Sequence, residues 1–405
     1  MPQLRRPSKG RVVTGLDIEP GAVRAVQARV DGGRLVVERS ASAALEPGIV
    51  RDGEVVEPEA LGAVLRDLFA EHKLDKRVRI GVANQRVVVR HLLLPPITDG
   101  KQLATAVRFM AADELPMPID QAVLDHVVLG PVETPEGPRT RVMVIAARRS
   151  MIDSLLAAAQ AAGLRPEGID LAAFAMIRAL GARDQAATLH LAVGGVVNLA
   201  VTRGDECVFT RVVAGGLEAM AAELAEREMF GIEDARAALA RVRLDVEPAP
   251  VPAPVAVEPA DEEPVAEEPA DEPILFFAGP ASVATDVAGE EPAAAPAPEP
   301  EPVAVTPRSD DERLQAEARA IMSDGLRRIA GEVRNSIDFH VGAADEQGAA
   351  VERVLLTGPA IAVPGFAEEL SRRLSLPVEA ADVDGAESPG TFAVAAGLAI
   401  AEAAA

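Results

Sequence analysis

The sequence predicts an α/β protein with two lobes, and two observations carry this prediction. Segments that alternate apolar and polar residues, as half-buried strands do, are followed by segments with the 3.6-residue spacing of helices. The order strand, strand, strand, helix, strand occurs near residue 12 and begins again near residue 188. A length of 405 residues suits two or three domain-sized units, because one core seldom exceeds roughly 250 to 300 residues. We therefore expect a duplicated β-β-β-α-β core.

The first copy of this order begins with a three-stranded meander over residues 11–40, in which Asp31-Gly32-Gly33 forms the second turn. A helix follows from Pro58, because proline is favoured in the first helical turn, where its missing N–H is not needed. The apolar run Val78–Ala83 then predicts the fourth strand.

The region after this strand predicts a further group of helices and strands. Its elements are expected at Asp99–Leu115 (helix), Ala122–Leu129 and Arg139–Ala147 (strands), Ser150–Gly163 (helix) and Leu171–Leu180 (helix). The first helix should end before Pro116, since the residue before a proline disfavours helical backbone. Ser150 is a predicted N-cap for the second helix.

The second copy occupies the remainder of the chain. Its predicted strands are Thr188–Thr202, Glu206–Val213, Val354–Thr357 and Val378–Ala380. Its predicted helices are Leu217–Glu228, Ile232–Val242, Asp311–His340 and Gly365–Leu374, with a last helix from Pro389. The longest of these helices places apolar residues near one face, which is typical of a helix packed on a core.

An acidic, proline-rich segment interrupts the second copy. From Val246 to Pro307 the chain holds 15 Pro, 14 Asp or Glu and no Lys or Arg. Such a segment cannot bury enough apolar surface to offset an ordering entropy of roughly 1 to 2 kcal/mol per residue, so we expect disorder. Its apolar island Ile274–Phe277 is either a chance cluster or a short docking motif.

Composition excludes several classes of function. The formal charge of −23 repels nucleic acid and anionic membranes, and the absence of Trp and Tyr removes the aromatic platforms of single-strand binders. Cys207 is the single cysteine, so no intrachain disulfide or cysteine-rich zinc site is expected, and a reducing cytoplasm fits best. The sequence shows neither a signal peptide nor an apolar run of about 20 residues.

Several motifs together resemble one protein family. A strand–turn–strand resembles the first phosphate loop of actin-like ATPases: Gly15-Leu16-Asp17-Ile18 followed by Gly21-Ala22-Val23-Arg24-Ala25-Val26. Further segments resemble the type IV pilus assembly protein PilM: Ala106–Phe109, Glu114–Pro116, Val127–Gly130, Ala146–Arg148, Ala161–Pro166, Glu332–His340, Val351–Gly358, Val363–Phe366 and Leu376–Glu379. The resemblance covers nearly everything except the first ten residues and the acidic segment.

This resemblance implies an actin-like two-lobed α/β fold, related to the division protein FtsA, with an inserted subdomain of the PilM and FtsA type. It implies an adaptor of a type IV pilus, or a related secretion machine, that binds the short cytoplasmic N-terminal tail of a PilN-like inner-membrane protein. Other platform or motor components would be further partners. The expected location is the cytoplasm, at the inner face of the cytoplasmic membrane, which the chain reaches only through partners.

The resemblance and the composition together give expected bounds for each part. They are a flexible N-terminus at 1–10, a first lobe at 11–83 and 166–186, an inserted partner-binding subdomain at 84–165, a second lobe at 187–230 and 346–405, a helical subdomain at 231–245 and 310–345, and a disordered insert at 246–309.

An actin-like nucleotide site needs glycine-rich hairpins whose N–H groups face phosphate, and carboxylates that hold Mg²⁺. If this chain retains the site, the resemblance implies that ATP and Mg²⁺ are its cofactors, with Asp17 near the metal. The nucleotide-binding residues would be Asp17, Gly21, Arg24, Gly194, Gly195, Asn198 and Gly358.

Three departures from the family pattern predict a degenerate site without catalytic residues. Glu19 and Pro20 add a charge and remove an N–H donor in the first loop. Leu191-Ala192-Val193 stands where the family has Asp-Ile-Gly, and Gly358-Pro359 replaces Gly-Gly. Glu19 either faces the phosphate position, where it repels an anion, or is a solvent-facing turn residue.

Partner binding is expected in the inserted subdomain. Five arginines are candidates for gripping an extended polar tail: Arg86, Arg90, Arg108, Arg148 and Arg149. The alternative is an ordinary solvated basic face.

Two rival functions stay open. One is a working actin-like ATPase with nucleotide-dependent assembly, which the altered loops disfavour. The other is an FtsA-like division anchor, which would need a basic amphipathic helix that the sequence lacks after Ala401.

Overall fold

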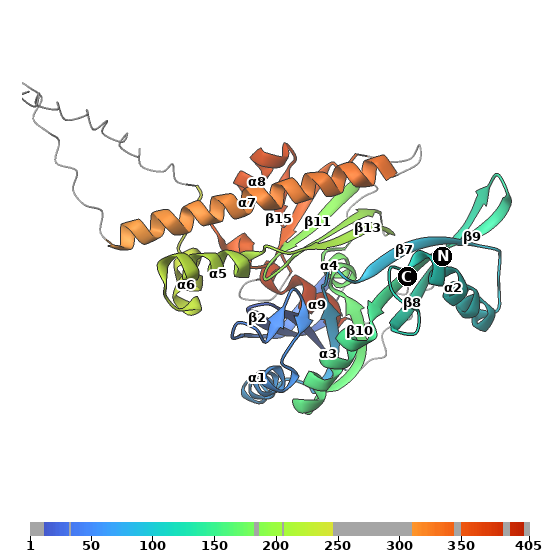
Figure 1. The fold of residues 1–405 in the computed structure, drawn as a ribbon, viewed down its shortest axis with the longest axis horizontal. Coiled ribbons are helices and arrows are strands. Elements are labelled where there is room, and N and C mark those ends of the chain that lie inside the picture. Colours follow the sequence, from blue (N-terminus) through green and yellow to red (C-terminus); the bar gives the residue numbers. More distant parts are fainter. Residues whose placement is uncertain are drawn as a thin grey trace, which may run out of the picture. The chain divides into compact units, whose positions relative to one another are not determined.

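Two five-stranded sheets organise the part of the chain that the computed structural model describes (Figure 1). The described residues are 12–31, 34–181, 186–204, 206–245, 310–343, 350–383 and 389–400. The expected flexible N-terminus and the expected insert, with its Ile274–Phe277 island, lie outside them.

The first sheet is a meander extended by two parallel strands. Its strands are β1 (Thr14–Glu19), β2 (Ala22–Asp31), β3 (Arg34–Ala44), β6 (Arg77–Val82) and β10 (Arg165–Leu171). Their order across the sheet is β3-β2-β1-β6-β10. The first three strands are antiparallel, and β6 runs parallel to both β1 and β10. A small hairpin, β4 (Val50–Arg51) and β5 (Glu54–Val55), precedes the first helix.

The second sheet repeats this arrangement strand for strand. Its strands are β11 (Ala187–Val193), β12 (Val197–Arg203), β13 (Glu206–Val213), β14 (Arg353–Thr357) and β15 (Val378–Ala380). Their order is β13-β12-β11-β14-β15, again with three antiparallel strands followed by two parallel ones. The predicted duplicated core is therefore confirmed.

Helices cover both faces of the first sheet. Helices α1 (Pro58–Glu71) and α3 (Arg149–Ala161) pack together on one face, where residues such as Leu61 and Ile80 are fully buried. Helices α4 (Ala172–Leu180) and α9 (Ala393–Ala399) share a core with residues of both sheets. They therefore form the layer between the two sheets.

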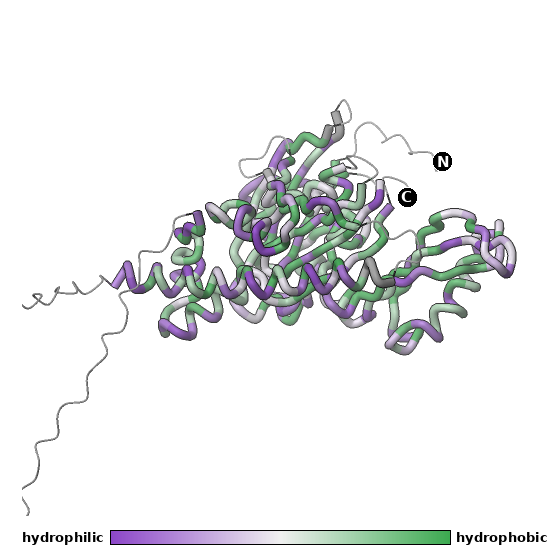
Figure 2. The backbone as a smooth tube through the Cα atoms, turned by 90° about the horizontal axis from the view of Figure 1, so that it is seen from above, coloured by the Kyte–Doolittle hydropathy of each residue, from purple (hydrophilic) through white to green (hydrophobic). Residues whose placement is uncertain are grey.

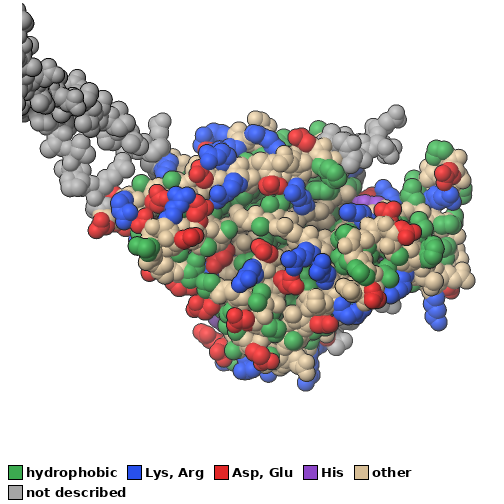
Figure 3. Space-filling view, viewed as in Figure 1, with side chains coloured by type: hydrophobic (Ala, Val, Ile, Leu, Met, Phe, Trp, Pro, Cys, Tyr) green, Lys and Arg blue, Asp and Glu red, His purple; other side chains and the backbone are tan. Residues whose placement is uncertain are grey.

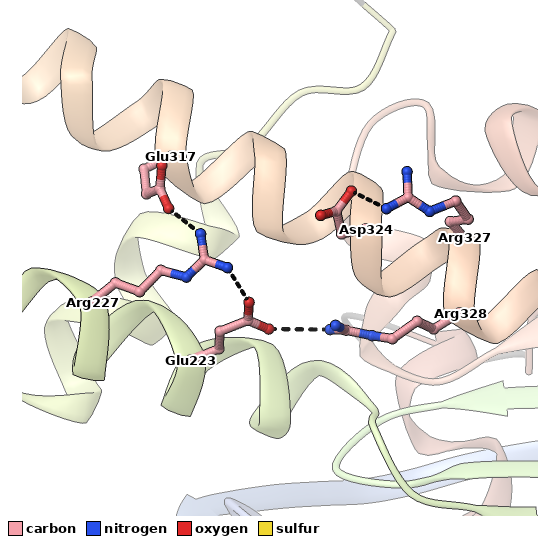
Figure 4. A network of polar contacts seen from close by, with 6 residues as sticks. All are labelled: Glu223, Arg227, Glu317, Asp324, Arg327 and Arg328. Atoms are coloured by element: carbon pink, nitrogen blue, oxygen red, sulfur yellow. Dashed lines mark hydrogen bonds and ion pairs between the residues drawn. The ribbon is translucent and has the colours of Figure 1, made fainter.

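The second sheet is covered on its other face by α5 (Leu217–Glu228), α6 (Ile232–Ala240), α7 (Asp310–Ala343) and α8 (Phe366–Leu374). Hydrophobic and hydrophilic residues alternate along α7 (Figure 2), as expected for a helix with one buried side. On the solvent side, Arg227 of α5 donates hydrogen bonds to Glu223 of the same helix and to Glu317 of α7, each 2.6 Å long (Figure 4). Such exposed pairs add little stability, so burial of the apolar side holds α7 in place.

The inserted subdomain has its own sheet and core. Strands β7 (Val88–Leu94), β9 (Gly137–Arg148) and β8 (Ala122–Thr134) lie in that order, all antiparallel, under α2 (Gly100–Glu114). Asp99 caps α2 by accepting a hydrogen bond from the Gln102 N–H at 2.8 Å.

Several local predictions differ from the structure. The predicted strand Thr188–Thr202 is two antiparallel strands, β11 and β12, and the sequence does not predict β7. Helix α3 begins at Arg149 and has no side-chain cap, so the prediction that Ser150 caps it is wrong. The chain from Pro389 to Phe392 forms a 3₁₀ turn before α9 begins. Strand β10 is not predicted by the sequence, because Pro166 and Gly168 favour a turn. The strand lies at the edge of the sheet, where a proline is tolerated because no neighbouring strand needs its missing N–H.

Candidate functional site

The hairpin between β1 and β2 carries three charged side chains on one buried face. Strand alternation places Asp17 and Glu19 on the same face, and the register sets Arg24 opposite Asp17. Arg24 Nη1 donates to Glu19 Oε2 at 2.9 Å and lies 3.9 Å from Asp17 Oδ2. All three residues are buried. Glu19 is therefore not the solvent-facing turn residue that the sequence left open.

The corresponding hairpin of the second sheet meets this carboxylate. The backbone N–H of Gly195, between β11 and β12, donates to Glu19 Oε2 at 3.1 Å. A Cβ atom at Gly194 would lie 2.2 Å from the same oxygen, and one at Gly195 would lie 2.1 Å from the Pro20 carbonyl oxygen. Gly195 is needed here because the hairpins touch through their backbones, whereas at Gly194 the missing Cβ leaves room for the Glu19 carboxylate.

A third glycine, Gly358, packs closely against the second hairpin. Gly358 follows β14 with φ +85°, a conformation that favours glycine, and its added Cβ would lie 2.7 Å from the Val193 carbonyl oxygen. Pro359 then begins a 3₁₀ turn over Pro359–Ala362. The space among Asp17, Thr357 and Gly358 is about 10 Å³, which is about the room that one water molecule needs.

Burial changes the protonation of this site. Burial, followed by the nearby Glu19 charge, raises the pKa of Asp17 to about 8, and Arg24 only partly opposes this. Asp17 is therefore mostly protonated at pH 7, and the remaining Glu19–Arg24 pair is neutral as a whole. A protonated carboxyl group is a poor ligand for Mg²⁺.

A pocket of about 330 Å³ lies beside the hairpins, and α5, α6 and α7 contribute apolar residues to its lining. Gly21, Arg24, Gly194 and Gly195 border it. Arg236 closes one wall, because its Nε donates to Glu218 Oε2 at 3.0 Å and its Nη2 donates to the Leu45 carbonyl at 2.9 Å. A phosphate group placed against both hairpins would have to displace the Glu19 carboxylate, so the residues present do not fit a bound polyphosphate.

Asn198, the remaining residue predicted to bind nucleotide, lies elsewhere. It borders a separate groove of about 480 Å³, which we call the Asn198 groove. This groove is lined by Val82, Asn84, Gln85, Val87, Val89, Leu171, Ala173, Asn198, Thr210–Ala214 and Glu332. It thus lies where the ends of β6 and β10, the start of β7 and the edge strand β13 meet. Asn198 is 2% exposed, and neither atom of its side-chain amide has a hydrogen-bond partner among the described residues.

The five predicted partner-binding arginines are spread over the inserted subdomain. Arg86 stands between two groove residues and is paired with Glu54 at 2.7 Å. The register that pairs Val88 with Ala146 brings Arg148 to the same end of that sheet.

Of the other three arginines, Arg149 directly follows Arg148 at the start of α3. Arg90 and Arg108 are exposed on β7 and α2, and Arg149 donates to the Ala122 carbonyl. On the face shown in Figure 3, basic and acidic side chains are interspersed rather than gathered by sign.

Comparison with known proteins gives the family. A family model described as "Type IV pilus assembly protein PilM" matches residues 15–246, which is more than half of the chain. The chain belongs to the PilM family. Among solved structures, the "PilM-PilN type IV pilus biogenesis complex" is 22% identical, with a TM-score of 0.67 over 96% of this chain and 98% of that one. This agreement across both lobes confirms the actin-like fold of the PilM family.

Two further structures are similar at lower scores. The ethanolamine utilization protein EutJ from Carboxydothermus hydrogenoformans is 14% identical, with a TM-score of 0.49 over 97% of this chain and 91% of that one. An MreB protein of Spiroplasma citri bound to ADP is 10% identical, with a TM-score of 0.48 over 96% of this chain and 95% of that one.

Within the described ranges, no group of three or more His, Cys, Asp or Glu residues could hold a metal ion. None of the described helices combines the length and apolar character needed to cross a bilayer.

Proposed function

We propose that this PilM-family chain is a cytoplasmic adaptor of a type IV pilus inner-membrane assembly complex, and that it binds the cytoplasmic N-terminal tail of a PilN-like membrane protein. Family membership supports the assembly role, and the related structure is titled as a complex of PilM with PilN. In this proposal the chain works at the inner face of the membrane because its partner is anchored there.

The Asn198 groove is the observation that carries this proposal. An extended peptide needs apolar contacts for alternate side chains and partners for its backbone N–H and C=O groups. Valine and leucine side chains line the groove, and β13, at the edge of the second sheet, offers backbone groups on its outer side. The Asn198 amide can donate and accept one hydrogen bond at once. A buried amide without a partner is unfavourable by about 1–3 kcal/mol, and a bound peptide would remove that penalty.

Charge next to the groove suits a polar or acidic tail. Arg86 and Arg148 stand at the end of the inserted sheet nearest the groove, and Arg86 is exposed apart from its pair with Glu54. We expect them to contribute to association rate, because exposed charges steer encounter more than they add affinity. Arg90, Arg108 and Arg149 stay weaker candidates for the same role.

A degenerate nucleotide site is part of the proposal. The second hairpin carries Leu191-Ala192-Val193 in place of an acidic residue, and Gly358 is followed by Pro359, which has no N–H to donate. We propose that tail binding requires neither ATP nor its hydrolysis.

Fluorescence anisotropy with a labelled synthetic peptide, taken from the tail of the PilN-like protein of the same organism, tests the adaptor role. We expect saturable binding that Asn198→Ala weakens about tenfold, the equivalent of one lost hydrogen bond of about 1.4 kcal/mol. Asn335→Ala is the matched control, because Asn335 is exposed on α7. Absence of binding to the unaltered chain would reject the proposed partner, and equal affinities of the two variants would reject the groove.

A further inference from the structure

The second hairpin has the features of an anion site. The Gly194 N–H bonds to the Val196 carbonyl within the hairpin, whereas the Gly195 N–H donates out of it, and an outward N–H group in such a turn can bind an anion. The Gly195 N–H points at an oxygen atom 3.1 Å away, and the missing Cβ of Gly194 leaves room for that oxygen. The oxygen belongs to Glu19, which comes from the other sheet, 176 residues away in sequence.

The Glu19 carboxylate satisfies the requirements of a resident anion. One oxygen, Oε2, accepts hydrogen bonds from both Arg24 and Gly195. Glu19 is buried at 5% exposure, so water screens these bonds weakly. A second anion would therefore have to compete with Glu19 for both the Gly195 N–H and the Arg24 guanidinium.

We infer that Glu19 is a built-in occupant of the anion site of the second hairpin, and that it joins the two sheets in place of a phosphate group. This inference rests on the proposed degeneration of the nucleotide site and goes beyond it, because it assigns the cause to one side chain. A phosphate group at this position would have to displace the Glu19 carboxylate, which already accepts the Gly195 N–H and lies against Gly194.

A second contact between the lobes supports the same conclusion. Arg236, on α6 of the second lobe, donates through Nη2 to the Leu45 carbonyl just after β3 of the first lobe, while its Nε and Nη2 both donate to Glu218. A Cβ atom added to Gly21 would lie 2.3 Å from Glu218 Oε2, so the missing side chain of Gly21 leaves room for the Glu218 carboxylate. The cleft is therefore closed by protein groups on both sides of the pocket.

The test removes the carboxylate and asks whether the vacated site takes a free anion. Glu19→Ala is compared with the unaltered chain by thermal unfolding and by calorimetric titration, using inorganic pyrophosphate and MgATP as probes. We expect Glu19→Ala to melt at a lower temperature without additives, and pyrophosphate to raise that temperature. Its affinity for pyrophosphate should exceed that of the unaltered chain at least tenfold, because the Gly195 N–H and Arg24 are then available to the anion.

Two further variants make the outcome decisive. Glu19→Gln keeps the size of the side chain but loses its charge, so it should lower the melting temperature and gain less anion affinity than Glu19→Ala. It also serves if Glu19→Ala does not fold. Glu38→Ala removes an exposed carboxylate that pairs with Arg29 on the same sheet, and should change neither quantity.

Each contrary result has a distinct meaning. Tight MgATP binding by the unaltered chain would overturn both this inference and the degenerate site. If neither the unaltered chain nor either Glu19 variant binds pyrophosphate, the inference is wrong and the degenerate site stands. A gain as large in Glu38→Ala would show a general charge effect and would also overturn it.

Discussion

Protonation of Asp17 makes the stability of this protein depend on pH, and Asp17→Asn isolates the effect. The pKa of Asp17 is raised from 3.8 in the unfolded chain to about 8 in the fold. Between these values the folded state holds a proton that the unfolded state has lost, so stability falls as pH rises. The slope is about 1.4 kcal/mol per pH unit, so the loss from pH 5 to pH 7 is about 3 kcal/mol.

Urea denaturation at pH 5, 6, 7 and 8 measures this slope. Subtracting the free energy of unfolding of the unaltered chain from that of Asp17→Asn removes the contribution of the other titrating groups. We expect this difference to increase by about 3 kcal/mol between pH 5 and pH 7, because only the unaltered chain loses stability through Asp17. Asp67→Asn, at an exposed position on α1, is the control and should leave the slope unchanged. A slope in Asp17→Asn equal to that of the unaltered chain would refute the assignment of this proton to Asp17.

Two further measurements test packing and thiol chemistry. Gly397→Ala should destabilise the fold by about 1–3 kcal/mol or more in urea denaturation, because its Cβ would lie 1.8 Å from the Ala175 carbonyl oxygen. Gly331→Ala on α7 is the control. No atom lies within 4 Å of its added Cβ, so it should be neutral or stabilising. Burial raises the pKa of Cys207 to about 12, so the native protein should react with a disulfide reagent at pH 8 far more slowly than the urea-unfolded chain, and equal rates would contradict the burial.

The sequence predicts most of the fold because its periodic segments are long and clearly bounded. Apolar spacing, together with the proline and glycine residues at the ends of elements, is enough to predict the meander, α1 with its leading Pro58, and the amphipathic α7. Strand β10 does not, since propensity at Pro166 and Gly168 is overridden by pairing with β6. Register between distant segments, such as β1 beside β6, is a tertiary property that no local pattern contains.

The candidate sites were predictable to a smaller extent. The sequence identified Glu19 and Pro20 as unusual in a phosphate loop, but the position of the Glu19 side chain depends on a hairpin 176 residues later. Asn198 was assigned to that hairpin because it follows Gly194 and Gly195 closely. Strand alternation instead places it on the face that borders a different groove. Pairing of Arg86 with Glu54 likewise arises only when β5 and the start of β7 meet.

The position of α9 also affects how the chain can fold during synthesis. This helix is buried along its whole length and packs against β1, β2 and α4, so residues 393–399 complete a core that begins at residue 14. A ribosome adding about 5–20 residues per second takes roughly 10 to 45 seconds to make the chain from the end of α4 to the end of α9. During that interval β1 and α4 lack the apolar cover that α9 gives them in the fold. The core of the first lobe is therefore completed only after nearly the whole chain has been made.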